Sequence, residues 1–143
     1  TLFRSYDTLK ILDHGLFSIE DLSFNSIFIR ANTRLREIAE FCGEPLPEEL
    51  ISSMKRTEEA LENLWDPYAK TYWSRDFITH KLLKEPSIAT LLPLYAGSIS
   101  KERAADLVRK LENEHVFGVN YPVPSVPLDS ADVNTERYWQ GPT

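Results

Sequence analysis

The side chains best suited to bind a small molecule lie near the end of the 143-residue sequence, at Tyr138, Trp139 and Gln140. A sugar presents apolar C–H faces and hydroxyl edges, so aromatic rings can stack on the faces while a carboxamide hydrogen-bonds the edges. Gly141 follows, and a glycine lets the backbone approach a ligand closely. The run therefore predicts one wall of a carbohydrate site. The alternative is that both rings only hold this segment against neighbouring helices.

A second candidate surface precedes the first, where Tyr121 and Ser125 flank two prolines. Each residue before a proline is disfavoured in the helical region, so the segment is predicted to be extended. In that conformation Tyr121 and Ser125 can line a groove. A rigid spacer between helix and loop is the competing interpretation, and the sequence favours it.

The sequence offers no recognisable catalytic or metal site. Glycoside chemistry needs two carboxylates facing each other across a substrate, and spacing along this chain identifies no such pair. There is no zinc-ligand pattern and no glycine-rich phosphate loop. Cys42, the single cysteine, is expected to be a small core residue of a helix. We therefore expect no catalytic residue, metal ligand or cofactor within this chain. The carboxylates and histidines considered were Glu20, Asp21, Asp66, Asp129, Asp132, Glu136, His14, His80 and His115.

Composition limits the class of protein. With 42% hydrophobic residues the chain is expected to form one packed core rather than a disordered segment. Sixteen basic against 22 acidic side chains give a net charge of −6, which disfavours a nucleic-acid partner. No apolar run approaches the roughly 20 residues of a membrane span.

The elements that must position the candidate residues are mainly helices. The strongest apolar periodicity begins at Leu22, with Asp21 as the expected N-cap and Gly43 as the left-handed residue after the last turn. The positions expected to face inward are Phe24, Ile27, Phe28, Ala31, Leu35, Ile38, Ala39 and Cys42.

A second helix is expected after Pro47, antiparallel to the first because the connector is short. Its apolar stripe, predicted to face the first helix, comprises Leu50, Ile51, Met54, Leu61 and Leu64.

After the second helix the sequence predicts shorter elements separated by irregular segments. Residues 65–86 favour a small hairpin or extended loop, and a helical segment then runs from Ser87 to Gly97 with Pro93 kinking or restarting it. A fourth helix begins at Ser100, with Ala104, Leu107, Val108 and Leu111 expected inward and Lys101, Glu102, Arg103 and Lys110 mostly outward. Near the N-terminus Tyr6, Leu9 and Leu12 are spaced for a turn or two of helix, and residues 114–143 read as a long irregular loop.

Several short motifs, taken in order, resemble a known family. They are FSIEDLSFN at 17–25, LPLYAG at 92–97, SKERA at 100–104, YPVPS at 121–125 and RYWQGP at 137–142. Together they resemble the catalytic domain of family-63-type glycoside hydrolases, including the mannosylglycerate and glucosylglycerate hydrolases. The resemblance covers nearly the whole chain.

The resemblance implies an all-α fold, in which paired antiparallel helices form part of an (α/α)6 barrel with a small hairpin excursion and a long C-terminal loop. Residues 1–143 would then be a single segment of that domain, incomplete at both ends. It also implies an intracellular, cytoplasmic enzyme that cleaves an α-glucosyl or α-mannosyl bond with inversion.

The resemblance further implies roles for particular residues. Tyr138, Trp139 and Gln140 match the family's pocket-lining segment, and Tyr121 and Ser125 match a loop close to it. The catalytic acid is expected before residue 1 and the base after residue 143, so the chain depends on the remainder of the same polypeptide and contributes contacts to a sugar substrate.

Two other functions stay open. One is an α-helical interaction module without enzymatic activity, whose proline-rich loop and exposed aromatic residues bind a protein. The other keeps the barrel but exchanges hydrolysis for lyase or phosphorylase chemistry, because a fold does not fix a function. The direction in which Tyr138 and Trp139 point distinguishes a concave sugar site from a flat partner surface.

Overall fold

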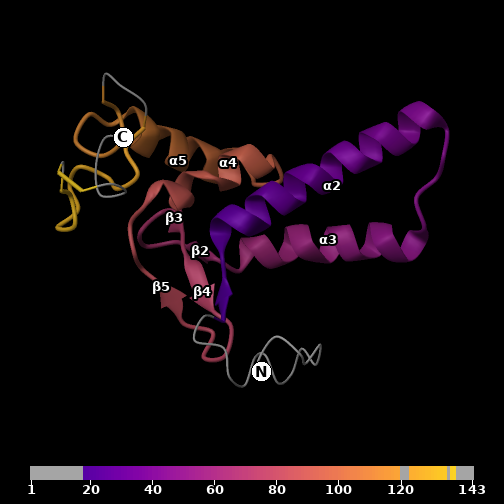
Figure 1. Ribbon diagram of the computed structural model, residues 1–143, viewed down its shortest axis with the longest axis horizontal. Helices are drawn as coiled ribbons and strands as arrows, with labels where there is room; N and C mark the ends of the chain where they lie inside the picture. Colours follow the sequence, from indigo (N-terminus) through magenta and orange to yellow (C-terminus); the bar gives the residue numbers. More distant parts are fainter. Residues whose placement is uncertain (1–17, 120–122, 135, 138–143) are drawn as a thin grey trace.

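The computed structural model describes residues 18–119, 123–134 and 136–137 of the chain (Figure 1). Within these residues the fold is rich in helix and carries two small antiparallel sheets, so the all-α prediction is confirmed only in part. The predicted helical turn at Tyr6, Leu9 and Leu12 lies outside the described residues. The elements are β1 (Ile19–Glu20), α2 (Leu22–Cys42), α3 (Glu48–Glu62), β2 (Trp65–Asp66), β3 (Thr71–Tyr72), β4 (Ser74–Asp76), β5 (Leu82–Leu83), the 3-10 helix η2 (Ile88–Leu91), α4 (Pro93–Ala96) and α5 (Lys101–Glu112).

Helices α2 and α3 form the antiparallel pair that the sequence predicts. Figure 1 shows them running side by side and joined by a short loop at one end. The Asp21 carboxylate accepts a hydrogen bond of 2.7 Å from the Phe24 N–H, and Gly43 ends α2 with φ at 70°, in the left-handed region. Both predicted caps are confirmed.

The buried face of α2 differs from the prediction. Leu22, Ser26, Ile29 and Asn32 are buried, whereas the residues expected inward lie mostly on the outside. The exposed members are Phe24, Ile27, Phe28, Ala31, Leu35, Ile38 and Cys42. The reason is geometric: with 3.6 residues per turn, the helix has packing residues on two opposite faces, and the described neighbours α3 and α4 cover only one. Cys42 is therefore not a core residue here.

Helix α3 confirms its predicted stripe over only part of its length. Met54, Leu61 and the following Leu64 are buried, but Leu50 and Ile51 near its start are exposed. The start of α3 lies beside the end of α2, at the far end of the helical pair from the sheets (Figure 1). At that end the two helices have no further neighbour among the described residues.

The segment between α3 and η2 forms strands in two small antiparallel sheets. Strands β2 and β3 form a hairpin that pairs Trp65 with Tyr72, which confirms the hairpin prediction. Strand β4 lies between β5 and β1, and its Asp76 pairs with Ile19. The excursion therefore reaches back to the entrance of α2.

Helical segments η2, α4 and α5 lie where the sequence predicts them, but the buried face of α5 differs from the prediction. Pro93 begins α4 directly after η2, and Gly97 ends it with φ at 75°. Ser100 caps α5 by accepting a hydrogen bond from the Arg103 N–H. In α5, however, Leu107 is buried beside the mostly buried Asp106, while Val108, expected inward, is 37% exposed.

Arg103, predicted to point mostly outward, is half-buried between two aromatic rings. Its guanidinium carbon lies 5.0 Å from the centroid of Trp65 and 5.8 Å from that of Tyr72. The same group forms an ion pair with Glu62 at the end of α3. We call Arg103, Trp65, Tyr72 and Glu62 the Arg103 cluster; it joins α3, the β2–β3 hairpin and α5.

The core follows from these contacts. It is one cluster of buried side chains drawn from helices, hairpin and the segment after α5: Leu22, Ile29, Leu61, Leu64, Tyr72, Leu91, Ala96, Leu107 and Phe117. Across the described part of the chain, no helix has the length and apolar character needed to cross a membrane.

Candidate functional site

One of the five residues predicted to bind a sugar is described by the structure. Ser125 is half-buried, and its carbonyl oxygen accepts a hydrogen bond of 2.9 Å from the Ile88 N–H at the start of η2. Pro124 beside it is fully buried. The other four, Tyr121, Tyr138, Trp139 and Gln140, lie outside the described residues, so their grouping stays a prediction.

A pocket of about 230 Å³ adjoins the point where Ser125 is anchored. Its walls come from the entrance of α2, strands β4 and β5, and η2, and they include Trp73, Glu85 and Ser87. Ser87 immediately precedes Ile88, the residue bonded to Ser125. We call this space the Trp73 pocket.

The Trp73 pocket combines an aromatic ring with polar groups. Among the described residues the Trp73 indole N–H is buried without a hydrogen-bond partner. The Ser74 hydroxyl is occupied, since it accepts a hydrogen bond of 3.2 Å from the Leu22 N–H, and the Thr90 hydroxyl donates to the Ser87 carbonyl. An indole beside a carboxylate and hydroxyls is chemistry that suits a polyol.

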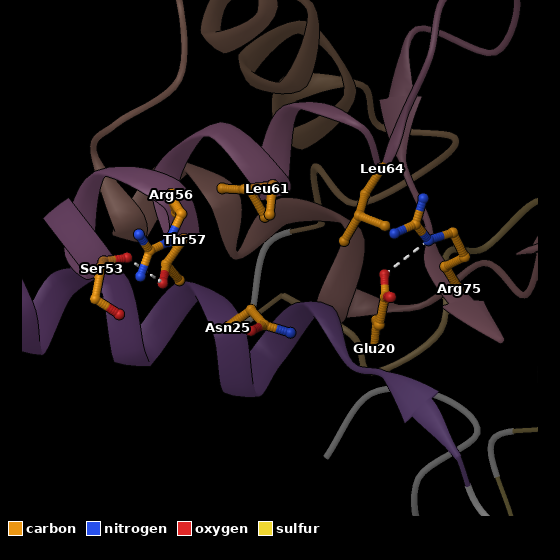
Figure 2. A pocket seen from close by; sticks show the side chains of 9 residues that line it. Glu20, Asn25, Ser53, Arg56, Thr57, Leu61, Leu64 and Arg75 are labelled. Carbon is orange, nitrogen blue, oxygen red and sulfur yellow. Dashed lines mark hydrogen bonds and ion pairs between the residues drawn. The ribbon is translucent and has the colours of Figure 1, made fainter. Parts of the chain in front are cut away.

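A second pocket, of about 300 Å³, lies between the start of α2 and α3 (Figure 2). Figure 2 shows the ion pair between Glu20 and Arg75 at one end and Arg56 toward the other, with Leu61 and Leu64 behind. The Glu20 Oε2 to Arg75 Nε distance is 2.7 Å. This pocket has polar walls but no aromatic ring, so it offers hydrogen bonds without a stacking surface.

The buried carboxylate of Asp66 has a structural role. Its Oδ2 lies 2.7 Å from the Lys84 Nζ, and its Oδ1 accepts hydrogen bonds from the N–H groups of Tyr68 and Ala69. The Lys84 hydrogen bond and these two N–H groups lower the pKa of Asp66 to about 2. The group therefore stays ionised and holds the β2–β3 turn, as expected from its place before Pro67.

Asp76 and Tyr72 are among the other side chains whose pKa is shifted, and both shifts have structural causes. The pKa of Asp76 is lowered by hydrogen bonds from the Thr79 N–H and hydroxyl. Burial raises the pKa of Tyr72 to about 12, against the opposing effect of Arg103. Neither group faces a partner that suits acid–base catalysis. In the described ranges no group of three or more His, Cys, Asp or Glu side chains could hold a metal ion.

Sequence reasoning missed the residues that make these sites. In the sequence Trp73 stands out only as part of a strand-favouring run, and Glu85 carries no signal of its own. The Arg103 cluster was missed because helical periodicity places Arg103 on the outer face of α5. The signal that could have found both is the density of aromatic residues between positions 65 and 73, where Trp65, Tyr72 and Trp73 occur.

Comparison with known proteins gives a consistent family. The model of a family described as the mannosylglycerate hydrolase MGH1-like glycoside hydrolase domain matches residues 1–143. A mannosylglycerate hydrolase of Thermus thermophilus is 35% identical, over 99% of this chain and 34% of its own length. A glucosylglycerate hydrolase of Mycolicibacterium hassiacum is 28% identical, over 96% of this chain and 32% of its own.

A solved structure is similar as well. The GH63 mannosylglycerate hydrolase from Thermus thermophilus in complex with glucose superposes with a TM-score of 0.85 at 35% identity, covering 98% of this chain and 36% of that chain. The chain thus spans about a third of the length of the relatives it matches. Both relatives are described as hydrolases, so they give no support to an interaction module without activity.

Proposed function

Because the chain belongs to the mannosylglycerate hydrolase MGH1-like glycoside hydrolase family, we propose that the protein carrying it hydrolyses an α-glycoside of a small acid such as glycerate, releasing mannose or glucose. The observation that carries this proposal is the match of the family model to all 143 residues. The TM-score of 0.85 to a mannosylglycerate hydrolase supports it.

The proposed mechanism is hydrolysis with inversion. One carboxylic acid protonates the leaving oxygen, while a carboxylate on the other side of the sugar activates a water molecule. Asp21, Asp66 and Asp76 each hold a helix cap or a turn, and Glu20 forms an ion pair with Arg75. We therefore assign the acid and the base to polypeptide outside these residues, within an (α/α)6 barrel of which this chain is a part.

The role proposed for this chain is substrate positioning. Tyr138 and Trp139 stack on the sugar ring and Gln140 hydrogen-bonds its hydroxyls, while Tyr121 and Ser125 line the adjoining loop. The bond between the Ser125 carbonyl and the Ile88 N–H supports this arrangement, because it ties the loop to the Trp73 pocket. The resemblance to intracellular-type glycosidases supports action in the cytoplasm.

The direct test is hydrolysis by the protein expressed from its complete reading frame. Mannosylglycerate, glucosylglycerate and a panel of small α-glucosides are supplied, and released reducing sugar is measured. The anomer of the product that appears first, followed by NMR, reports inversion or retention. Failure to hydrolyse any α-glycoside in the panel would contradict the proposal.

The positioning role has its own test. Trp139→Ala is expected to lower kcat/KM by about fivefold, since a stacked ring contributes roughly 1 kcal/mol to binding a sugar. Tyr68→Ala is the matched control, because Tyr68 is 97% exposed on the β2–β3 turn and lines neither the Trp73 pocket nor the pocket of Figure 2. Equal activity of both variants would remove Trp139 from the site.

A further inference from the structure

The wall of the Trp73 pocket carries a polar atom that the described residues leave unsatisfied. The Trp73 backbone N–H donates a hydrogen bond of 3.0 Å to the Leu64 carbonyl oxygen, so the main chain is held in place. The indole Nε1 is buried and has no hydrogen-bond partner in the described part of the chain. A buried donor without an acceptor is costly, and folded proteins normally satisfy such groups with protein, water or ligand. This indole N–H therefore needs an acceptor that the described residues do not supply.

The same pocket has other polar groups with unused hydrogen-bonding capacity. The Asp21 carboxylate uses Oδ1 to cap α2, and no hydrogen bond to its Oδ2 occurs within the residues that the structure describes. The Ser87 hydroxyl makes no capping hydrogen bond at the start of η2. The Glu85 carboxylate is exposed and has no ion pair within the described ranges. A ligand in this pocket meets one N–H donor, one hydroxyl and two carboxylates.

The charge of the pocket selects among ligands. Among the described residues its walls carry Asp21 and Glu85 but no Lys, Arg or His side chain. Lys84 and Arg75 adjoin wall residues in the sequence, but each forms an ion pair at 2.7 Å with a carboxylate that does not line the pocket. The pocket therefore disfavours an anion and favours an uncharged ligand.

Size and apolar surface narrow the choice further. The volume of about 230 Å³ lies below the roughly 300–1,000 Å³ of pockets that hold drug-sized molecules, so the pocket suits one small ring. Leu22, Leu83 and Ala89 supply apolar walls beside the indole. The C–H face of a sugar packs on such a surface, while its hydroxyls both donate and accept hydrogen bonds. An uncharged polyol matches all of these properties.

We propose that the Trp73 pocket binds one uncharged polyol of the size of a monosaccharide. One ligand hydroxyl accepts the hydrogen bond of the Trp73 indole N–H, and others donate to the carboxylates of Asp21 and Glu85. The same carboxylates disfavour the acid part of a glycerate glycoside at this place. The proposal does not rest on the proposed function, because it is drawn from the chemistry of a pocket whose walls belong to the described residues.

The Trp73 indole N–H is itself the probe. The protein expressed from its complete reading frame is prepared with isotope-labelled tryptophan for NMR, and the Trp73 indole signal is identified by its loss in Trp73→Phe. Titration with D-glucose or D-mannose is expected to shift that signal until it saturates, with a Kd on the order of 1 mM for a ligand of about a dozen heavy atoms. D-glucuronate adds a carboxylate to the same ring, and it is expected to bind about tenfold more weakly than D-glucose.

A matched pair of variants locates the ligand. Glu85 and Glu114 are both exposed and have no ion pair among the described residues, but of the two only Glu85 lines the pocket. Glu85→Gln is expected to reduce the preference for D-glucose over D-glucuronate about threefold, because one of the two negative charges is gone. Glu114→Gln is expected to leave that preference unchanged.

Three results overturn the proposal. The first is a Trp73 indole signal that does not move in D-glucose and D-mannose at about 100 times the expected Kd. The second is a parent protein that binds D-glucuronate as tightly as D-glucose. The third is equal behaviour of Glu85→Gln and Glu114→Gln, which means that the sugar shifts the signal from another site.

These readouts do not use glycosidase activity, so the two proposals fail separately. An inactive protein whose Trp73 indole signal shifts as expected contradicts only the proposed function. An active protein whose Trp73 indole signal does not move contradicts only the polyol site.

Discussion

The Arg103 cluster and the exposed apolar face of α2, formed by Phe24, Ile27, Phe28, Leu35 and Ile38, differ in how their side chains are covered. In the Arg103 cluster a cation lies between two rings and pairs with Glu62, and every partner belongs to this chain. The large apolar residues on the exposed face of α2 are 41% to 69% exposed, and two of them, Phe24 and Phe28, stack with ring centroids 6.4 Å apart. The difference shows that side chains at the sheet end are satisfied within this chain, whereas the apolar face of α2 is largely uncovered by the described residues.

The largest effect on stability is expected in the hydrophobic core near the sheets, at Leu107 in α5. Leu107→Ala should lower the free energy of unfolding by about 2–5 kcal/mol, because Leu107 has 0% exposure and its loss leaves a cavity. Val108→Ala, one position along α5, should cost less than about 1 kcal/mol since Val108 is 37% exposed. Urea unfolding of both variants measures the two values. Comparable losses would mean that α5 has the register expected from its sequence.

A smaller loss is expected from the Arg103 cluster itself. Arg103→Met keeps much of the packing but removes the ion pair with Glu62 and the contact with the Tyr72 hydroxyl, at a cost of about 1.5–3 kcal/mol. Arg109→Met is the control on the same helix, with a guanidinium side chain 65% exposed and an expected cost below about 1 kcal/mol. If the two variants unfold at the same urea concentration, the cluster does not hold the hairpin to α5.

The smallest effect concerns pH. The pKa of Asp66 is about 2 in the folded chain against an ordinary value of 3.8, so its contribution to stability is present above pH 3.8 and is lost as the pH falls toward 2. Lys84→Met removes the largest cause of that shift, so the variant should lose less stability than the parent between pH 4 and pH 2.

Thermal unfolding across this pH range measures the difference. Lys55→Met serves as the control, because Lys55 is 77% exposed and its ion pair within the described ranges is with Glu59 on the same helix. A steeper acid loss in Lys84→Met than in the parent would refute Lys84 as the main cause of the lowered pKa of Asp66.

The sequence predicts those features of this fold that depend on a few adjacent residues. Asp21, Gly43, Pro93 and Ser100 each act within one helical turn, and the structure confirms the boundaries they set. The inward face of α2 could not be predicted in the same way. Apolar residues at three- and four-residue spacing identify a helix, but the choice between two apolar faces depends on which neighbours are present.

For the candidate site the sequence predicts a kind of ligand but not the positions of the side chains. Aromatic and carboxamide residues near a glycine predict a sugar site, and both this role and the positions of Tyr138, Trp139 and Gln140 stay predictions. Trp73 escaped notice because one wall of its pocket is formed by Ile19, Asp21 and Leu22, more than 50 positions earlier in the sequence. Contacts between residues so far apart in the sequence produce no periodic pattern of apolar residues.

The short strand β1 also has a consequence for the order in which the chain folds. Helices α2 and α3 need only a short loop between them, so they can associate early. Strand β1 can pair only after β4 has formed and lies close to it. Its two residue pairs with β4 must then offset the entropy lost in closing a long loop. We therefore expect the start of α2 to be the last part of the helical pair to become ordered. Refolding rates should respond to changes in β4 more than to changes in the α2–α3 connector.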